Sequence, residues 1–450
     1  MLSGSITKGL LALSIPIMVM NVVQSIFNII DMTVLRVFSD DGAVGAVGAS
    51  GTLITLCTSL LIGVAAGANV VVAKRIGLGN KDRVKKAITT AVSFSVVGGL
   101  LLMIVGAIMA ETLLKMTNCP ESLLPKATSY FRIYFYGIPL LMLYNFCAAI
   151  LRASGDTKRP MYFLILGGII KVLFTLLFVT VTDMDVEGVA VATNISSLVI
   201  SVLAFRTLMK NEQTHIDFKK IRFYGSELKE MIFIGIPSGL QTAMYSLANV
   251  VIVSTVNSFG ADAATGVAIA NQFDGIMYQI TYAPSLATIP YVAQNIGAGN
   301  IDRVKKTVIR AVLITTSFGL CFGLLSAIFS AELSSIMSTT PVVIKYSQQK
   351  MILVSSTYFL CGINEILGGA LKGMGKPIIP AVSTMIFMCL IRFPWVYFVF
   401  PLCRNLTFLY LIWPIGWISS VITLLIFYFP AISRLQAQIS QTEEAKEAVL

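Results

Sequence analysis

The sequence is poor in charged residues. Asp, Glu, Lys and Arg together make up only 12% of its 450 residues, whereas a soluble domain carries roughly 25%. Hydrophobic residues reach 56%. This composition excludes a water-soluble globule and predicts a chain that is embedded in a lipid bilayer.

Histidine and cysteine give no sign of a metal site. The one histidine, His215, lies in a polar stretch near charged residues, where we expect water to solvate it. The seven cysteines are scattered singly and form no Cys-x-x-Cys pair, which argues against zinc and against a disulfide framework. We therefore expect no bound metal and no cofactor.

Catalytic and nucleotide motifs are also missing. The sequence contains no His-Glu-x-x-His or Gly-x-Ser-x-Gly pattern, so a membrane-embedded enzyme is only a remote alternative. Gly375-Lys376 lacks the other residues of a phosphate-binding loop. An ATP-driven pump would therefore need a separate subunit.

What the sequence has in abundance is long hydrophobic stretches. A helix needs about 20 mainly apolar residues to cross a bilayer, and we find twelve such stretches. They cover residues 10–35, 46–73, 87–110, 127–150, 160–181, 188–206, 230–254, 263–293, 307–330, 347–371, 378–400 and 408–430. The sequence thus predicts an all-α polytopic membrane protein with twelve transmembrane helices.

The distribution of basic residues predicts the topology. Most of the 33 Lys and Arg residues fall in segments that twelve spans place on one side of the membrane. The loops on the opposite side hold only Arg36, Lys115, Lys126, Lys345 and Arg404. Because cytoplasmic loops carry the excess of Lys and Arg, both termini are expected in the cytoplasm of a plasma (inner) membrane protein. The net charge of +11 is then a topology signal and no indication of nucleic acid, and we expect a monomer.

One basic motif occurs twice. Residues 76–88 and 296–308 are identical at nine of thirteen positions, 220 residues apart, and residues 151–155 and 371–375 repeat at the same offset. Both copies lie on the cytoplasmic side, so each half contains an even number of spans. The halves are therefore parallel repeats, with a substrate site expected between them near the middle of the membrane.

The repeat divides the chain into four parts. We predict an N-terminal six-helix lobe at 1–206, a cytoplasmic linker at 207–229, a C-terminal six-helix lobe at 230–430 and a cytoplasmic tail at 431–450. Prolines within the spans are expected to bend their helices. These are Pro16, Pro139, Pro237 and Pro284.

The repeated Gly-x-Gly-Asn-x-x-Arg loops, the segment 151–160 and the segment that begins Gly67-Ala-Asn-Val resemble the multidrug and toxic compound extrusion (MATE) transporters. The resemblance covers essentially the whole chain. It implies a V-shaped, two-lobed transporter that exports small organic, amphipathic or cationic compounds in exchange for protons or sodium ions by alternating access. A lipid-linked saccharide flippase of the wider superfamily is the alternative.

Five charged residues lie well inside the hydrophobic stretches. The acidic ones are Asp31, Asp274 and Glu365, and the deepest basic ones are Lys171 and Arg392. A charge at bilayer depth costs about 3 kcal/mol or more, so each is a candidate for function. Structural pairing is the competing explanation.

A polar stripe runs along the first span. Asn21, Gln24, Asn28 and Asp31 recur at spacings of three and four, which places them on one face of a helix. Four polar positions in a row favour a water-filled cavity over packing against another helix. The MATE resemblance implies that Asp31 binds the coupling proton or sodium ion.

The fifth span departs from the family pattern. The resemblance leads us to expect an asparagine and, four residues later, an acidic residue, but this chain has Lys171 and Thr175. Thr193 matches the family's threonine in the sixth span. We hypothesise that Lys171 and Asp31 form a buried pair that opens when the carboxylate is protonated or substrate binds. A permanent salt bridge is the alternative.

The second half carries its own charged positions. Asp274 and Arg392 share a depth, so they can pair, while Glu365 corresponds to Asn145 at an offset of 220. Other polar and aromatic residues are predicted to line the cavity with Asp274 and the polar stripe. They are Tyr136, Gln241, Tyr245, Asn271 and Tyr278.

Overall fold

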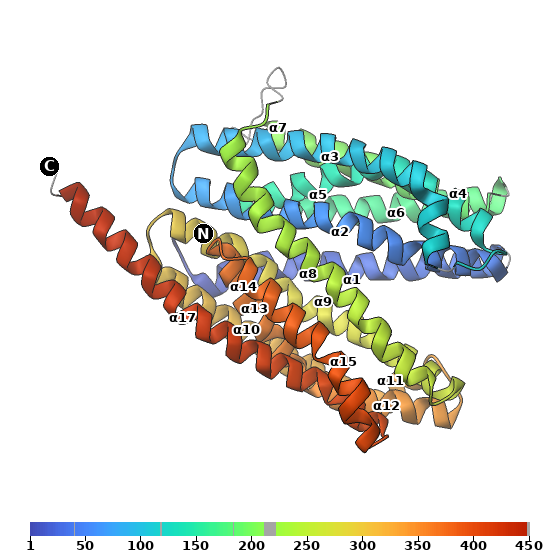
Figure 1. Ribbon diagram of the computed structural model, residues 1–450. Coiled ribbons are helices and arrows are strands. Elements are labelled where there is room, and N and C mark those ends of the chain that lie inside the picture. Colours follow the sequence, from blue (N-terminus) through green and yellow to red (C-terminus); the bar gives the residue numbers. More distant parts are fainter. Residues whose placement is uncertain (40, 118, 183, 211–221, 448–450) are drawn as a thin grey trace. The chain divides into compact units, whose positions relative to one another are not determined.

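The computed structural model describes residues 1–39, 41–117, 119–182, 184–210 and 222–447. This part of the chain folds into helices and contains no strand (Figure 1). The all-α fold class predicted from the sequence is confirmed.

Eight helical segments are long and apolar enough to cross a membrane, and two bent pairs of shorter helices raise the number to ten. Helices α8 (Gly225–Asn257) and α9 (Ala261–Gly297), 33 and 37 residues long, cover the remaining two of the twelve predicted stretches. The helices of the described residues therefore fit the predicted twelve spans.

The chain forms two compact units. The N-terminal unit is Val19–Leu240, and the C-terminal unit combines Met1–Met18 with Gln241–Leu450. The sequence placed the division between whole helices, whereas the contacts place it inside α1 (Ile6–Phe38) and inside α8. Each unit thus contains the beginning of a helix whose remainder belongs to the other unit.

The N-terminal unit contains six complete helices besides its parts of α1 and α8. These are α2 (Asp41–Gly77), α3 (Lys81–Met116), α4 (Leu124–Tyr136), α5 (Ile138–Ala153), α6 (Lys158–Val181) and α7 (Val186–Lys210). Helices α4 and α5 meet at an angle of 50°. Gly137 lies at the break and Pro139 in the first turn of α5, so the bend predicted for Pro139 is confirmed.

The C-terminal unit repeats this order with more interruptions. After α9 come α10 (Ile301–Ile328), α11 (Ser330–Ser335), α12 (Pro341–Ser356), α13 (Tyr358–Gly373), α14 (Ile378–Thr384), the π-helix η2 (Met385–Leu390), α15 (Arg392–Pro394), the π-helix η3 (Trp395–Val399), the 3₁₀-helix η4 (Phe400–Leu402), α16 (Leu406–Tyr410) and α17 (Ile412–Glu447). Helices α12 and α13 meet at 45°. Their break at Thr357 lies 220 residues after Gly137, which is the repeat offset.

The two copies of the basic motif form the same turn. Gly79 and Gly299 have φ angles of 69° and 74°, a left-handed conformation that glycine adopts without steric cost. The next residue in each copy, Asn80 or Asn300, caps the following helix by accepting a hydrogen bond of 3.0 Å from the amide three residues on. The sequence repeat is therefore also a structural repeat.

Glycine contacts explain why α8 begins in the N-terminal unit. A Cβ atom on Gly67 of α2 would lie 2.2 Å from the carbonyl oxygen of Met231, and one on Gly63 would lie 2.4 Å from that of Gly235. The two backbones touch because neither glycine has a side chain, as is common between helices in membranes.

Ion pairs reinforce the contact between α2 and α8. The Arg75 guanidinium lies 3.0 Å from Glu227 and 2.6 Å from Glu230, and Lys74 lies 3.0 Å from Glu230. Glu227 is buried. The beginning of α8 is thereby fixed to the N-terminal unit by charge as well as by shape.

The beginning of the chain is held in the C-terminal unit in a different way. Arg303, from the second basic motif, donates hydrogen bonds of 2.9–3.0 Å to the carbonyl oxygens of Met1, Ser3 and Gly4. These bonds hold the residues just before α1 in the C-terminal unit. The hydrophobic pattern of the sequence does not predict them.

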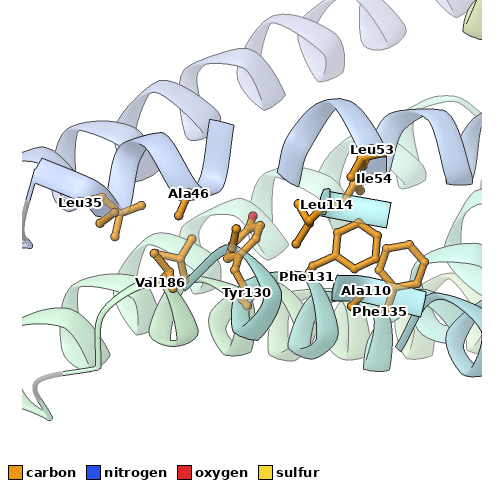
Figure 2. Packing of buried hydrophobic residues seen from close by; sticks show 14 of the residues in the cluster. Leu35, Ala46, Leu53, Ile54, Ala110, Leu114, Tyr130, Phe131, Phe135 and Val186 are labelled. Carbon is orange, nitrogen blue, oxygen red and sulfur yellow. The ribbon is translucent and has the colours of Figure 1, made fainter. Parts of the chain in front are cut away.

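Aromatic packing forms part of the hydrophobic core of the N-terminal unit. Figure 2 shows Phe131 and Phe135 of α4 beside Leu114 and Ala110 of α3, and the two phenyl rings stack with centroids 4.3 Å apart. Gly106 of α3 leaves room for the Phe135 ring, because a Cβ atom there would lie 1.8 Å from it. This core fixes α3 against α4.

Candidate functional site

A buried ion pair lies in the N-terminal unit. The Nζ atom of Lys171 on α6 is 2.5 Å from Oδ2 of Asp31 on α1, and the Asp31 side chain is only 8% exposed. The hydroxyl of Thr175, one helical turn beyond Lys171, donates to Oδ1 of Asp31 at 3.4 Å. The predicted pairing of Asp31 with Lys171 is confirmed as a contact, and Thr175 joins it.

Small residues bring the two helices close enough for this pair to form. A Cβ atom on Gly168 of α6 would lie 1.7 Å from the ring of Phe27 on α1. Lys171 follows Gly168 by three residues and Asp31 follows Phe27 by four, so both charged side chains lie one turn beyond the contact. This spacing brings the Lys171 ammonium next to the Asp31 carboxylate.

The opposite charges of Lys171 and Asp31 balance each other. Both charges are largely removed from water, and removing one partner from such a pair is strongly unfavourable because it leaves an uncompensated charge. The Lys171 ammonium lies beside the Asp31 carboxylate, so the pair as a whole carries no net charge. A proton taken up by Asp31 would cancel the attraction between the two.

The rest of the predicted polar stripe makes no hydrogen bond with this pair in the described part of the chain. Gln24 and Asn28 are exposed, and Asn21 is half-buried. The Thr193 hydroxyl donates at 2.8 Å to the carbonyl of Val189 in its own helix. The role predicted for these four residues in binding substrate or ions stays a prediction.

Tyr136 lies elsewhere in the same unit. Its side chain is 58% exposed and lines a surface hollow of about 530 Å³ together with Glu111 and Arg132. No hydrogen bond or ion pair joins Tyr136 to Asp31 among the described residues.

A second buried ion pair lies in the C-terminal unit, and it corrects a sequence prediction. Oδ2 of Asp274 on α9 is 2.8 Å from Nζ of Lys350 on α12. The shared depth of Asp274 and Arg392 had allowed Arg392 as the partner. Lys350 also donates to the side-chain oxygen of Asn271, one turn before Asp274. The pairing of Asp274 with Arg392 that their shared depth allowed is therefore not the one that forms.

Sequence reasoning missed Lys350. The residue lies at the edge of the predicted span 347–371, next to the polar run that begins at Lys345, so it reads as a residue at the membrane surface. In the structure its side chain is only 2% exposed. A mid-span aspartate needs a cationic partner, and this requirement was the signal that could have directed attention to Lys350.

Arg392 is buried among aromatic rings. Its guanidinium carbon lies 5.5 Å from the ring centre of Tyr245 and 5.4 Å from that of Trp413, and Nη1 donates to Oδ1 of Asn249 at 2.6 Å. The Tyr245 ring stacks in turn on Tyr278, with centroids 6.5 Å apart. The structure thus brings together Tyr245, Tyr278 and Arg392 from the predicted set.

Two other predicted residues have hydrogen-bond partners outside this cluster. The side-chain nitrogen of Gln241 donates to the hydroxyl of Thr384 at 2.8 Å. Glu365 on α13 forms no ion pair with any described residue, and its backbone carbonyl accepts from Ser285 at 2.7 Å.

No group of three or more His, Cys, Asp or Glu side chains that could hold a metal ion occurs in the described ranges. The seven cysteines are all free thiols.

Comparison with known proteins identifies the family. The MatE profile matches residues 16–177 and 237–398, one match in each half. "Probable multidrug resistance protein YoeA" of Bacillus subtilis (strain 168) is 25% identical over 391 residues, which cover 85% of this chain and 84% of that protein. The "FAD transporter" of Shewanella oneidensis is 27% identical over 351 residues, covering 75% of this chain and 76% of that protein.

Solved structures agree on the fold. The "Crystal structure of MATE in the straight conformation" superimposes with a TM-score of 0.89 at 19% identity. An outward-facing multidrug resistance MATE family transporter also gives 0.89, at 20% identity. Each comparison covers 97% of this chain and 98% of the other. Together with the two profile matches over most of the sequence, these likenesses show that the chain belongs to the MatE family of multidrug efflux transporters.

Proposed function

We propose that this protein is a secondary active antiporter that exports small amphipathic organic molecules in exchange for protons and needs no bound cofactor. The observation that carries the proposal is the buried contact of Asp31 with Lys171 and Thr175. The carboxylate of Asp31 can take up a proton, and it attracts the Lys171 ammonium strongly only while it is ionised.

The proposed mechanism alternates two states of Asp31. With Asp31 ionised, Lys171 holds α6 against α1. Protonation removes the charge on Asp31 and frees the ammonium, so the contact between the helices weakens. Release of the proton on the other side of the membrane restores the pair and returns the protein to its first state.

The energy of one proton is enough for useful export. One elementary charge moving through 100 mV releases about 2.3 kcal/mol. Since about 1.4 kcal/mol corresponds to a factor of ten, a single proton supports a substrate gradient of roughly 40-fold. A stoichiometry of one proton per substrate therefore suffices.

Protons are favoured over sodium as the coupling ion. Hard cations in proteins are bound by several oxygen ligands, but the contacts of Asp31 provide one hydroxyl and one ammonium. The ammonium would repel a sodium ion at this position, whereas a proton needs only the carboxylate.

The substrate class is proposed from the relatives and from the charges. The names of relatives include multidrug resistance proteins and an FAD transporter, which supports organic substrates with aromatic rings. A cationic substrate is less favoured here than the resemblance implied, because Asp31 and Asp274 are both already paired with lysines.

We further propose that the chain is a monomer in the plasma membrane with both termini in the cytoplasm. The support is the basic motif, which both halves carry at the same end of their second long helix. Single cysteines placed at the two Gly-Asn turns of a cysteine-free variant should be labelled by an impermeant maleimide only after the cells are opened. Labelling in intact cells would reverse the proposed topology.

Reconstituted vesicles test the proposed coupling directly. Purified protein in proteoliposomes that contain an aromatic dye should release the dye when a proton gradient is imposed. An equal sodium gradient at constant pH should have no effect. Release driven by sodium alone, or unchanged by either gradient, would overturn the proposal.

A further inference from the structure

Arg392 is the counterpart of Lys171 in the second copy of the repeat. The family profile matches residues 16–177 and 237–398, which are 221 residues apart at both ends. At this offset Lys171 corresponds to Arg392. Each copy therefore has one basic residue at the same depth of its fifth span.

A π-helix explains why the offset here is 221 and not 220. The fifth spans begin in register at 220, with left-handed glycines at Gly155 and Gly375. In the second copy, the amide of Ile391 bonds to the carbonyl of Ile386, five residues back, at 2.9 Å. A π turn holds one residue more than an α turn, so the residues after η2 are shifted by one.

The carboxylate of the first copy has no counterpart in the second. Helices α1 and α8 correspond at 221, as their internal prolines Pro16 and Pro237 do. The residue of α8 that corresponds to Asp31 is Ile252, which is only 3% exposed. The second copy therefore has a basic residue at this position of the fifth span but no acidic residue at the position that corresponds to Asp31.

The surroundings of Arg392 do not replace that partner. The Arg392 side chain is 2% exposed. Within the described residues its one hydrogen bond is to Asn249, and the rings of Tyr245 and Trp413 lie against the guanidinium. Aromatic faces attract a cation, but they carry no negative charge to neutralise it. A buried charge without a charged partner is costly.

The other carboxylates of this unit do not fill the gap. Asp274 is paired with Lys350, and Glu365 forms no ion pair within the described residues. The Lys350 ammonium lies 5.3 Å from the ring centre of Trp413, the same ring that contacts Arg392. Two cations thus contact the half-buried Trp413 ring, and of these only Lys350 has a carboxylate partner among the described residues.

The irregular helix around Arg392 positions this cluster. Arg392 lies between the π-helices η2 and η3, and such stretches are frequent at functional sites. Gly416 of α17 allows a close approach to η2, because a Cβ atom there would lie 2.6 Å from the carbonyl oxygen of Phe387. Trp413 precedes Gly416 by one turn, which brings its ring to the guanidinium.

We propose that Arg392, with Tyr245 and Trp413, binds the carboxylate or phosphate group of an aromatic substrate, so that the substrate supplies the acid that Asp31 supplies in the first copy. A guanidinium can bind either group through two parallel hydrogen bonds. The rings of Tyr245 and Tyr278 stack on each other beside the guanidinium, and the edges of such rings attract the face of a further aromatic group. The proposal names the substrate class of the antiporter and rests on the proposed function for its direction of transport.

The substitution Asn249→Asp tests this site. It places a carboxylate of nearly the same shape at the position that already contacts Arg392, and thereby occupies the guanidinium from within. The purified protein should bind fluorescein, an aromatic dianion, more tightly than rhodamine 6G, a cation with the same ring system. The variant should bind fluorescein about tenfold to a hundredfold more weakly, which is the range for a charge-assisted hydrogen bond.

Matched variants separate this effect from a general one. Asn300→Asp makes the same chemical change at an exposed helix cap of the same unit, where aspartate caps equally well, and it should leave both affinities unchanged. Arg392→Gln should weaken fluorescein binding as Asn249→Asp does, and melting curves identify any variant that has not folded. Because Asn249→Asp completes an ion pair, we expect it to melt no lower than the wild type.

Two results would overturn the inference. One is a wild-type protein that binds rhodamine 6G as tightly as fluorescein, or does not bind fluorescein at all. The other is a folded Asn249→Asp variant that keeps full affinity for fluorescein. Binding is measured without any gradient, so it is independent of coupling. If protons drive efflux but the protein does not bind the anion, the proposed antiport stands and the proposed anion site is wrong. If the protein binds the anion but protons do not drive efflux, the anion site stands and the proposed antiport is wrong.

Discussion

The Nζ atom of Lys350 lies 2.8 Å from one carboxylate oxygen of Asp274, while the other carboxylate oxygen has no hydrogen-bond partner among the described residues. This pair connects α9 to α12 in the C-terminal unit, just as Asp31 and Lys171 connect α1 to α6 in the N-terminal unit. Each unit therefore contains a buried lysine–aspartate pair, and the two pairs join different helices of the repeat.

Breaking the pair of Lys350 and Asp274 should destabilise the C-terminal unit. Lys350→Met leaves the Asp274 carboxylate buried and unpaired, and we expect a loss of about 3–5 kcal/mol. Unfolding in detergent, followed by circular dichroism, measures the change. The double variant Lys350→Met with Asp274→Leu should recover much of the loss. A single variant as stable as the wild type would show that the pair is not buried as described.

Replacing Lys171 should change which ion drives transport. Lys171→Asn removes the ammonium beside Asp31 and leaves carboxylate, amide and hydroxyl oxygens, which suit a hard cation. We expect efflux from proteoliposomes to become stimulated by sodium, whereas Lys171→Arg should retain the behaviour of the wild type. Efflux by Lys171→Asn that stays indifferent to sodium would contradict a role for Lys171 as a substitute for a bound cation.

The glycine contact between α2 and α8 should not tolerate a side chain. At Gly67 the obstructing atom is the backbone oxygen of Met231, which cannot rotate away, so Gly67→Val should cost about 1–3 kcal/mol. Gly48→Ala in the same helix is the control, because nothing lies within 4 Å of its Cβ position. That change should stabilise the helix by about 0.5–1 kcal/mol. Melting temperatures compare the two, and an unaffected Gly67→Val would argue against the close crossing.

Much of the fold could be predicted from the sequence because membranes impose simple rules. The length of the hydrophobic stretches, the excess of basic residues on one side and the repeated motif at Gly79 and Gly299 gave the helices and the two halves. The division inside α1 and α8 could not be predicted. It depends on tertiary contacts, such as that of Gly67 with Met231, which hydropathy does not encode.

The candidate site was predictable only in part. Helical spacing and depth identified Asp31 and Lys171, and their contact is confirmed. Shared depth allowed Asp274 to pair with Arg392, but depth does not specify which faces of two helices meet, and Lys350 is the partner. Lys350 was missed because it lies at the end of a polar run. In the structure, α12 and α13 form one broken span, and Lys350 lies within its first part.

In the proposed mechanism, Asp31 is the group that carries the proton. Proteoliposomes loaded with a pH-sensitive dye and given a gradient of exported substrate report proton movement against substrate movement. The wild type and Asp31→Glu should show substrate-driven proton flux, and a folded Asp31→Asn variant should show none. Proton flux in Asp31→Asn equal to that of the wild type would contradict the account.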